Sequence, residues 1–505
     1  MLSIQTELIN SIKKNQNRNA FYIGEIFYTY AQLNFVVDNI RNAIKNTSRI
    51  ENKHIGLLIY DDIETYASIL ACWLEGKAYI PINPYSPIDR NKNVLKQSEI
   101  GIVLTSHTVK GYSGFKKINT SLLPSPNLVD NNGDYKNHNS DLAYIFYTSG
   151  TTGKPKGVPI TFSNLISFCK AFDAMECTMT EEDRCLQMFD LTFDLSVMSY
   201  LIPLLKGACV YTIPKDAIKY SYIFELMEEQ KLTFSLMVPS MLHYLRPYFE
   251  EIHCPDMKYS LFCGEALPLN VTEEWADCIP NAKIMNVYGP TEDTIFCTEL
   301  TYQRNLPNKT YNGVLSIGKP MKGAYTIIVD NSNAIVPQGK KGELCLAGEQ
   351  LTKGYWKDPK KNKTSFFTIE YNNTLTRFYR TGDLCFIDED GDIMYSGRVD
   401  FQAKIQGYRV ELSEVELYAK EGLHKMNAVA ITFTNGIGNL EIGLVIEGAK
   451  INTTPLLDHM KSKMPSYMIP TKIKFIASFP LNSNGKIDRN KLSTLFIENK
   501  ILNEM

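Results

Sequence analysis

Residues 147–157 form a loop whose composition suits phosphate binding. The loop reads YTSGTTGKPKG, so glycines alternate with hydroxyl side chains and two lysines follow. Glycine lets the backbone approach an anion closely, the hydroxyls donate hydrogen bonds, and Lys156 supplies positive charge. The loop is not a Walker A motif, because Pro155 follows Lys154 where that motif has serine or threonine. Since a solvent-exposed turn often has the same composition, its interpretation depends on the rest of the chain.

Five further motifs follow this loop in a fixed order. They are FCGEALP at 262–268, NVYGPTE at 286–292, YRTGD at 379–383, GRVDFQAKIQGYRVE at 397–411 and NGKIDR at 484–489. In this order and spacing the chain resembles the adenylate-forming superfamily, which includes acyl-CoA synthetases, luciferases and the adenylation domains of peptide synthetases. The resemblance covers nearly the whole chain. It implies that ATP activates a carboxylic acid as an acyl-adenylate and that a thiol then displaces AMP.

Length and composition indicate an intracellular enzyme with more than one domain. The chain has 505 residues, of which 44% are hydrophobic and 21% charged, and its net charge is −2. This charge argues against a general nucleic-acid or membrane-surface binder. The eleven cysteines and seven histidines are scattered without metal-ligand spacing, which predicts free thiols in a reducing compartment and no zinc site. Without an apolar leader or an 18-residue apolar run, we expect a cytoplasmic protein with no nucleic-acid partner and no membrane insertion.

Strand-like and helix-like segments alternate in the first half of the chain. Residues 54–60 and 78–82 read as buried strands, and residues 64–76 between them have helical spacing that ends on glycine. This alternation predicts parallel sheets covered by helices. Residues 124–141, rich in Asn, Asp and Gly, read as a loop that leads into a strand at 142–147 and so into the phosphate loop.

A small α+β domain is expected after the large α/β domain. Ser413 and Glu416 have the spacing of a capping box at the start of a helix. Three short strands are predicted at 428–433, 441–446 and 472–476. The resemblance implies an N-terminal ATP- and amino-acid-binding domain (1–398) and a mobile C-terminal domain (399–505) that rotates about a hinge near Asp400. As an isolated residue, Asp400 would instead read as a loop-capping carboxylate.

The resemblance assigns residues to the three parts of the nucleotide: the phosphates, the adenine and the ribose. The phosphates would be bound by Thr148, Ser149, Gly150, Thr151, Thr152, Gly153 and Lys156, with Thr152 in direct contact. The adenine would lie among Tyr288, Gly289, Asn286, Gly264 and Glu265. The ribose would be bound by Asp383, and Arg398 would reach the ribose or a phosphate.

Four residues are predicted to act on the reacting groups: Lys486, Thr152, Thr291 and Glu292. Thr291 would donate to the α-phosphate. Glu292 would hold Mg²⁺, an ion that prefers carboxylate and phosphate oxygens. Lys486 would bridge the substrate carboxylate and the ribose or α-phosphate, which lowers the repulsion between two anions as they meet. As isolated residues, Thr291 and Glu292 could equally belong to a turn and a helix N-cap.

Asp194, in the motif FDLSVM at 193–198, is the strongest indication of the substrate class. In amino-acid-activating relatives, this aspartate pairs with the α-ammonium group of the substrate. The alternative is an ordinary aspartate at a helix N-terminus. By their positions in the motifs, the resemblance assigns the pocket for the substrate side chain to Leu195, Met198, Cys263, Val287 and Ile295, together with Met237, Leu261 and Phe296. These residues are mostly large and apolar, which predicts a small, uncharged amino acid.

The motifs FDLSVM and FCGE are similar to those of D-alanine–D-alanyl carrier protein ligases. The resemblance implies that D-alanine is activated and then transferred to the phosphopantetheine thiol of a separate carrier protein. A stand-alone adenylation enzyme for another small amino acid is the main alternative, because Ile295 and Phe296 are bulkier than is usual in these ligases. An acyl-CoA synthetase would not need Asp194. A nucleotide-binding protein without turnover would not need Glu292, Asp383 and Lys486.

Overall fold

The computed structural model describes residues 3–47, 53–123, 142–150, 153–423, 426–481 and 487–498, and the backbone of 502–503. The chain divides into two compact units. The first unit comprises Met1–Pro84, Val94–Tyr147 and Gly157–Val399. The second unit comprises Tyr85–Asn93, Thr148–Lys156 and Asp400–Met505.

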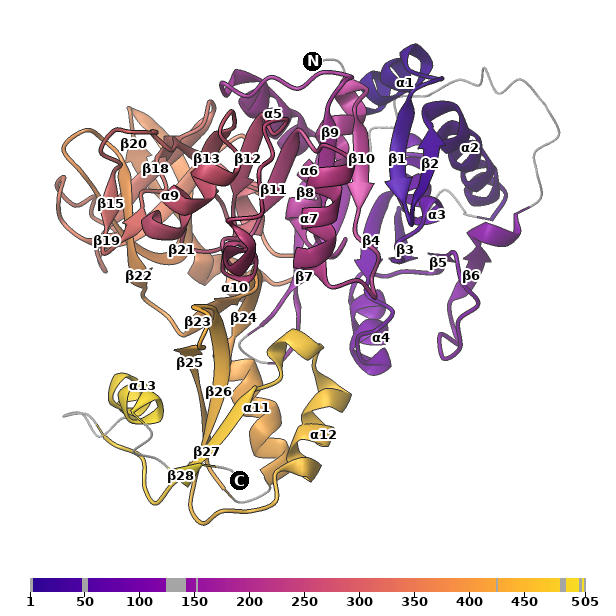
Figure 1. The fold of residues 1–505 in the computed structure, drawn as a ribbon. Helices are drawn as coiled ribbons and strands as arrows, with labels where there is room; N and C mark the ends of the chain where they lie inside the picture. Colours follow the sequence, from indigo (N-terminus) through magenta and orange to yellow (C-terminus); the bar gives the residue numbers. More distant parts are fainter. Residues whose placement is uncertain are drawn as a thin grey trace. The chain divides into compact units, whose positions relative to one another are not determined.

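The first unit contains a nine-stranded sheet with the order β17-β14-β13-β12-β11-β9-β10-β1-β2 (Figure 1). Neighbouring strands from β1 to β13 pair in parallel, whereas β2, β14 and β17 pair antiparallel at the two edges. The strands are β1 (Asn19–Ile23), β2 (Ile26–Thr29), β9 (Arg184–Gln187), β10 (Cys209–Thr212), β11 (Phe234–Met237), β12 (Tyr259–Phe262), β13 (Lys283–Tyr288), β14 (Thr298–Thr301) and β17 (Lys319–Pro320).

A six-stranded sheet with the order β6-β5-β3-β4-β7-β8 lies earlier in the chain (Figure 1). Its strands are β3 (His54–Leu58), β4 (Ala78–Ile82), β5 (Ile102–Thr105), β6 (Lys116–Asn119), β7 (Leu142–Thr148) and β8 (Lys156–Thr161). Helix α3 (Ile63–Leu74) joins β3 to β4, which pair in parallel. The Asp62 carboxylate accepts from Thr65 N at 2.8 Å and starts this helix, and Gly76 (φ 62°) follows its end. The predicted strand–helix–strand order and parallel pairing are confirmed.

A third, antiparallel sheet of the first unit has the order β18-β19-β21-β20, with β22 paired to β21. Its strands are β18 (Ala324–Val329), β19 (Gly342–Gly348), β20 (Phe366–Tyr371), β21 (Thr374–Ile387) and β22 (Ile393–Arg398). A short hairpin is formed by β15 (Thr310–Tyr311) and β16 (Val314–Leu315). Asp383 and Arg398 are register partners on β21 and β22, so their side chains share one face of the sheet.

Helix α6 (Asp194–Lys206) is buried from Asp194 to Leu204. It packs against β9 and β10, and it ends at Gly207, whose φ of 81° suits a glycine C-cap. The burial fixes the first residue of the helix, Asp194, relative to the sheet. The other helices with residues in this unit are α1 (Ile4–Lys14), α2 (Tyr30–Thr47), α4 (Ile88–Gln97), α5 (Phe162–Ala174), α7 (Lys219–Glu229), α8 (Ser240–Leu245), α9 (Leu269–Cys278), α10 (Pro359–Ser365) and the short η1 (Thr120–Leu122), η2 (Arg246–Tyr248) and η3 (Thr291–Asp293).

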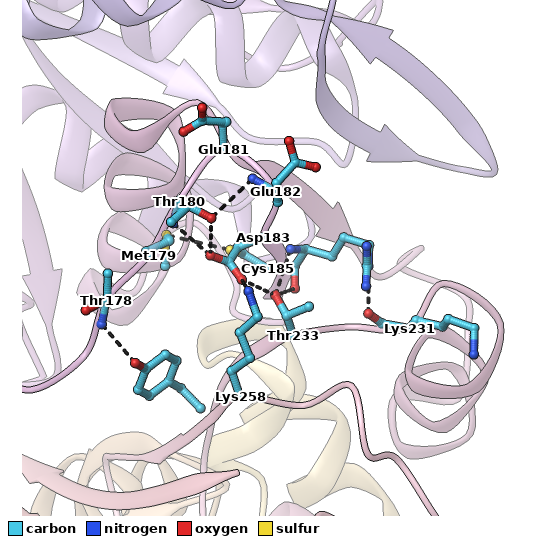
Figure 2. A network of polar contacts seen from close by, with 12 residues as sticks. Thr178, Met179, Thr180, Glu181, Glu182, Asp183, Cys185, Lys231, Thr233 and Lys258 are labelled. Atoms are coloured by element: carbon cyan, nitrogen blue, oxygen red, sulfur yellow. Dashed lines mark hydrogen bonds and ion pairs between the residues drawn. The ribbon is translucent and has the colours of Figure 1, made fainter. Parts of the chain in front are cut away.

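One buried carboxylate joins the starting ends of three parallel strands (Figure 2). Asp183, Thr233 and Lys258 each immediately precede a strand: β9, β11 and β12. The Asp183 carboxylate accepts from Thr180 N and Thr233 Oγ1, both at 2.7 Å, and it pairs with Lys258 Nζ at 2.8 Å. Burial raises the pKa of Asp183, but the Lys258 ammonium and the other donors outweigh burial and lower this pKa overall.

The second unit contains a two-stranded ribbon and a four-stranded sheet with the order β25-β26-β27-β28. Its strands are β23 (Gln402–Ile405), β24 (Tyr408–Glu411), β25 (Ala428–Thr434), β26 (Leu440–Glu447), β27 (Lys472–Ile476) and β28 (Leu502–Asn503). Its helices are α11 (Leu412–Leu423), α12 (Thr454–Lys463), α13 (Arg489–Ile497) and the short η4 (Ser466–Met468). The three predicted strands are confirmed to within one residue at each end.

The predicted capping box at Ser413 is wrong. Helix α11 begins at Leu412, so Ser413 already lies inside the helix. The Glu416 carboxylate faces away from the helix start, because it accepts from Ala430 N at 2.9 Å and pairs with Arg489 at 2.6 Å. The Glu416 side chain therefore forms tertiary contacts and not the helix cap that the local sequence pattern predicts.

All eleven cysteines are buried and keep their thiols, as the sequence predicts. Among the described residues, none of the helices is both long and apolar enough to cross a membrane.

Candidate active site

Asp194 presents a buried carboxylate at the first position of α6. The residue is 7% exposed, and its Oδ2 has no hydrogen-bond partner within the described part of the chain. Burial raises its pKa to about 7, the Thr291 side chain lowers the value by hydrogen bonding, and the charge of Glu292 raises it. A buried oxygen of this kind is costly unless a cation or donor pairs with it. The position therefore suits an ammonium group.

The residues predicted to form the side-chain pocket belong to one buried hydrophobic cluster. The cluster draws on α6, β12, β13 and the segment that follows β13. Met237 is the exception among the residues transferred by motif position, because it belongs to a second cluster. The members of the first cluster that concern the pocket are Leu195, Met198, Leu261, Cys263, Val287, Ile295 and Phe296.

The segment that follows β13 folds back tightly on itself. Cys297 N donates to the Tyr288 carbonyl at 2.8 Å and closes the loop. Gly289 is required by this closure, because a Cβ there would lie 2.3 Å from Phe296 Cα. The loop thus carries Glu292 at one end and the pocket residue Ile295 near the other.

Glu292 lies fully buried within this loop. Tyr355 donates its hydroxyl to Glu292 Oε1 at 2.6 Å, and Thr352 N donates to the Glu292 carbonyl at 2.8 Å. The described residues contain no group of three or more His, Cys, Asp or Glu side chains placed to hold a metal ion. Mg²⁺ is commonly bound through one or two carboxylates, with phosphate and water as the other ligands, so a single Glu292 fits this ion.

Asp383, Arg398 and Tyr288 come together at one point. The Asp383 carboxylate lies 2.7 Å from Arg398 Nη1, and it accepts from the Tyr288 hydroxyl at 2.5 Å. Burial and then the charge of Asp383 raise the pKa of Tyr288 well above its usual range, so the hydroxyl stays protonated and donates. The residues predicted for ribose and for adenine are therefore adjacent.

The remaining adenine candidates follow or lie within neighbouring strands. Gly264 (φ 93°) and Glu265 come after β12, as Gly289 comes after β13. Asn286 donates its amide to the Ser316 carbonyl at 2.8 Å, and Glu265 accepts from Ser240 N at 2.8 Å. Since β12 and β13 are parallel neighbours, these residues lie at the same edge of the sheet.

The phosphate loop belongs to the second unit, where two carboxylates contact it. Lys156 Nζ lies 2.9 Å from Glu411 Oε1, in a pair that is less than 10% exposed on both sides. Gly150 N donates to Glu414 Oε2 at 3.2 Å, and Ser149 Oγ donates to the Arg409 carbonyl at 2.7 Å. The loop thus presents an ammonium group and a backbone N–H to anionic oxygens.

Four other residues of this loop are predicted to bind phosphate. Thr148 ends β7, and Gly153 has the positive φ (74°) that favours glycine. Thr151, Thr152 and Lys486 lie outside the described residues. Glu411 and Glu414 lie in the stretch RVELSE at 409–414, which carries no local mark of a partner far away in sequence.

Comparisons with known proteins identify the family and the fold of the chain. The sequence model of the AMP-binding enzyme family matches residues 8–356. The D-alanine–D-alanyl carrier protein ligase of Bacillus velezensis is 30% identical over 484 residues, which are 92% of this chain and 93% of that protein. Tyrocidine synthase 3 of Brevibacillus parabrevis is 32% identical over 475 residues, which are 93% of this chain but only 7% of that much longer protein.

A solved structure shows the same fold. The adenylation domain AlmE of Vibrio cholerae, in complex with glycyl-adenosine-5'-phosphate, has a TM-score of 0.84 at 24% identity and covers 98% of each chain. The chain therefore belongs to the AMP-binding enzyme family and has the adenylate-forming fold, mixed α/β with a large N-terminal domain and a small C-terminal domain.

Proposed function

We propose that this protein activates a small amino acid with ATP and transfers it to the phosphopantetheine thiol of a separate carrier protein. Membership of the AMP-binding enzyme family implies the use of ATP. Relatives of matching length are D-alanine–D-alanyl carrier protein ligases, which supports an amino acid as substrate and a carrier protein as partner. The observation that carries the proposal is the buried carboxylate of Asp194.

Asp194 distinguishes an amino acid from other carboxylic acids. Its unpartnered Oδ2 is buried beside the apolar cluster of Leu195 and Met198. An α-ammonium group would supply a charge-assisted hydrogen bond there and would lower the pKa of the carboxyl group. A fatty or aromatic acid would leave the carboxylate unpaired, which is costly in a buried position. This argument favours an aminoacyl-adenylate over the intermediate of an acyl-CoA synthetase.

The reaction consists of two displacements. In the first, an oxygen of the substrate carboxylate attacks the α-phosphorus of ATP, and the bond to the β-phosphate breaks to release pyrophosphate. In the second, the carrier thiol loses its proton, its sulfur attacks the acyl carbon, and AMP leaves. Both reactants of the first step are anions, so cations and hydrogen-bond donors must stabilise the transition state.

The predicted residues supply these groups. Lys156 and Lys486 carry positive charge, and Thr152 and Thr291 carry donor hydroxyls. Bound Mg²⁺, held by Glu292, would neutralise phosphate charge. Asp383 would fix the ribose, because a carboxylate accepts hydrogen bonds from both hydroxyl groups.

D-alanine is the proposed amino acid. The motif FDLSVM, with Cys263 in FCGE, supports D-alanine, as do the ligases among the relatives. A different small amino acid is the second candidate, because the bulky Ile295 and Phe296 belong to the same buried cluster as Cys263. In that case the protein would be a stand-alone adenylation enzyme with the same mechanism.

ATP–pyrophosphate exchange tests the proposal directly. We expect exchange with D-alanine above L-alanine, glycine and D- or L-serine. Asp194→Asn, which keeps the shape but removes the charge, should lower kcat/KM for the amino acid by ~100-fold or more while ATP still binds. A lack of exchange with every amino acid tried, or an unaffected Asp194→Asn variant, would contradict the proposal. AMP release that free CoA stimulates would indicate an acyl-CoA synthetase.

A further inference from the structure

We propose that Gln350 is a positioning residue that sets the amino-acid selectivity of this protein. It acts on the pocket loop, defined here as residues 293–297. The inference rests on the proposed function, because that function assigns Ile295 of this loop to the substrate pocket. The experiment below separates failure of the inference from failure of the function.

The Gln350 side chain connects three carbonyl groups of the pocket loop. Gln350 is 1% exposed, and its Nε2 lies 2.9 Å from Phe296 O, 3.2 Å from Asp293 O and 3.4 Å from Thr294 O. In return, the Thr294 hydroxyl donates to the backbone carbonyl of Gln350 at 2.5 Å. The opposite orientation of the amide would place its oxygen against three carbonyl oxygens, so the chemistry fixes the donor toward the loop.

The pocket loop needs such support because its backbone is strained. Thr294 and Ile295 have φ values of 54° and 76°, and both are β-branched residues for which positive φ is unfavourable. Consecutive residues in this region persist only where surrounding contacts hold them. Gln350 contacts carbonyls on both sides of Ile295, so it holds the residue whose side chain belongs to the pocket.

The same loop is packed from two other directions. Gly289 lies against Phe296 Cα, where a Cβ would come within 2.3 Å. The Phe296 ring meets Phe168 of α5 edge-on, with centroids 5.0 Å apart. These contacts leave little room for the loop to shift while Gln350 is in place. Loss of the amide would remove the polar contacts that hold the carbonyl groups.

Gln350 is itself positioned by α5. The Asn164 amide donates to Glu349 O at 2.8 Å and to Leu351 O at 3.2 Å, which are the two residues flanking Gln350. Asn164 also forms a capping box with Thr161 at the start of α5. These hydrogen bonds fix the backbone of Gln350 relative to α5. Through the Gln350 side chain, the pocket loop is in turn positioned relative to the same helix.

The consequence concerns which side chains the pocket accepts. A shift of Ile295 changes the space beside the substrate Cβ while leaving Asp194 in place on α6. One methylene more or less in an apolar pocket changes discrimination by roughly 10- to 200-fold. A positioning role for Gln350 therefore predicts altered ratios between amino acids, not only a lower rate.

The test is Gln350→Met, which keeps the side-chain length and removes the side-chain amide. We expect the kcat/KM ratio of alanine to valine to change by ~10-fold, with KM for the amino acid raised and KM for ATP within ~2-fold of the wild-type value. Arg304→Met is the matched control, because Arg304 also donates to three backbone carbonyls (Ala276, Ile279 and Ala282) at and just after the end of α9 in the same unit. The control should lower Tm without changing the ratio.

A second variant covers the case in which Gln350→Met does not fold. Thr294→Val is nearly isosteric and removes only the hydroxyl bond to Gln350 O. It should shift the same ratio in the same direction by a smaller factor. An unchanged ratio in whichever variants fold, with Tm lowered as in the control, would overturn the inference while the wild-type exchange still supports the function. Absence of exchange in the wild type would overturn both.

Discussion

At the scale of single residues, the proposed function makes the binding of an ammonium group depend on the ionisation of Asp194. Burial raises its pKa to about 7. Only the carboxylate attracts a cation, so kcat/KM for the amino acid should rise with pH and level off above this value. Asp194→Asn should lack the rising limb. Pyrophosphate exchange of both proteins across neutral pH measures this, and a flat wild-type profile would count against the role of Asp194.

The same carboxyl group links folding to pH in the absence of substrate. Its pKa is raised in the folded state, so the folded chain keeps a proton that the unfolded chain has released. The contribution of Asp194 to stability is therefore most favourable below the ordinary aspartate pKa of about 4, and it declines as pH rises to about 7. A bound ammonium group offsets this decline.

The residues of the site differ in how far the sequence could predict them. Asp194, Glu292 and Asp383 lie in short motifs, so the sequence could single them out as candidates, but it could not show that Tyr288 and Asp383 meet across 95 residues. Gln350 was missed, because its three carbonyl partners lie 54 to 57 residues away. The sequence around Gln350 has no pattern that indicates its hydrogen-bond partners, so only the structure shows that this side chain contacts the pocket loop.

At the scale of elements, the Asp183 carboxylate connects the starting ends of β9, β11 and β12. These ends lie at the edge of the sheet opposite to the one where Gly264 and Gly289 follow their strands. Asp183→Asn should lower the free energy of unfolding by about 1–2 kcal/mol, since Asp183 is buried but Lys258 is half exposed. The pKa of Asp183 is lowered in the folded state, so its contribution is present above the ordinary aspartate pKa and is lost as pH falls through the lowered value.

Thermal unfolding checks this prediction. The Tm gap between wild type and Asp183→Asn should narrow in acid, and pyrophosphate exchange should be unaffected at neutral pH. Asp256→Asn is the control, because Asp256 pairs with Lys231 at 3.5 Å on the surface and its loss should change Tm little. An equal drop in Tm for Asp183→Asn and Asp256→Asn would contradict a larger contribution of the buried carboxylate to stability.

Hydrophobic spacing predicted β3, α3 and β4 closely because each element has its pattern within a few residues. The strand order of the nine-stranded sheet could not be predicted in this way, since β1 pairs with β10 almost 190 residues later. The capping box at Ser413 failed for a related reason, because Glu416 found partners in β25 and α13. Local signals set element type, and long-range contacts set where polar side chains go.

At the scale of the whole molecule, the phosphate loop is engaged by carboxylates within the second unit. Glu411 pairs with Lys156, a residue that the proposed function assigns to phosphate. Glu411→Gln keeps the shape and leaves Lys156 without this charged partner, so KM for ATP should fall by ~3- to 10-fold. Glu421→Gln is the control, because Glu421 faces His459 at 3.5 Å elsewhere in this unit. An unchanged or higher KM for ATP in Glu411→Gln would contradict competition between the carboxylate and phosphate.

The resemblance assigns phosphate binding to residues 147–157, but it does not predict which part of the structure this loop groups with. Loop residues Thr148–Lys156 cluster with Asp400–Met505, although more than 240 residues separate them in the chain. Tertiary contacts such as Ser149 with Arg409 create this grouping, and neither sequence segment carries a sign of it alone.

The burial of every native thiol makes the molecule convenient for spectroscopic labelling. All eleven cysteines are buried, and burial raises the pKa of Cys169 to about 12, so the reactive thiolate is scarce at neutral pH. A cysteine introduced at an exposed position of each unit, such as Tyr325 and Ile437, would then react with a maleimide probe in preference to the native thiols. Distances between two such probes, followed during turnover, would test whether the two units move relative to one another, and no native cysteine would need to be removed.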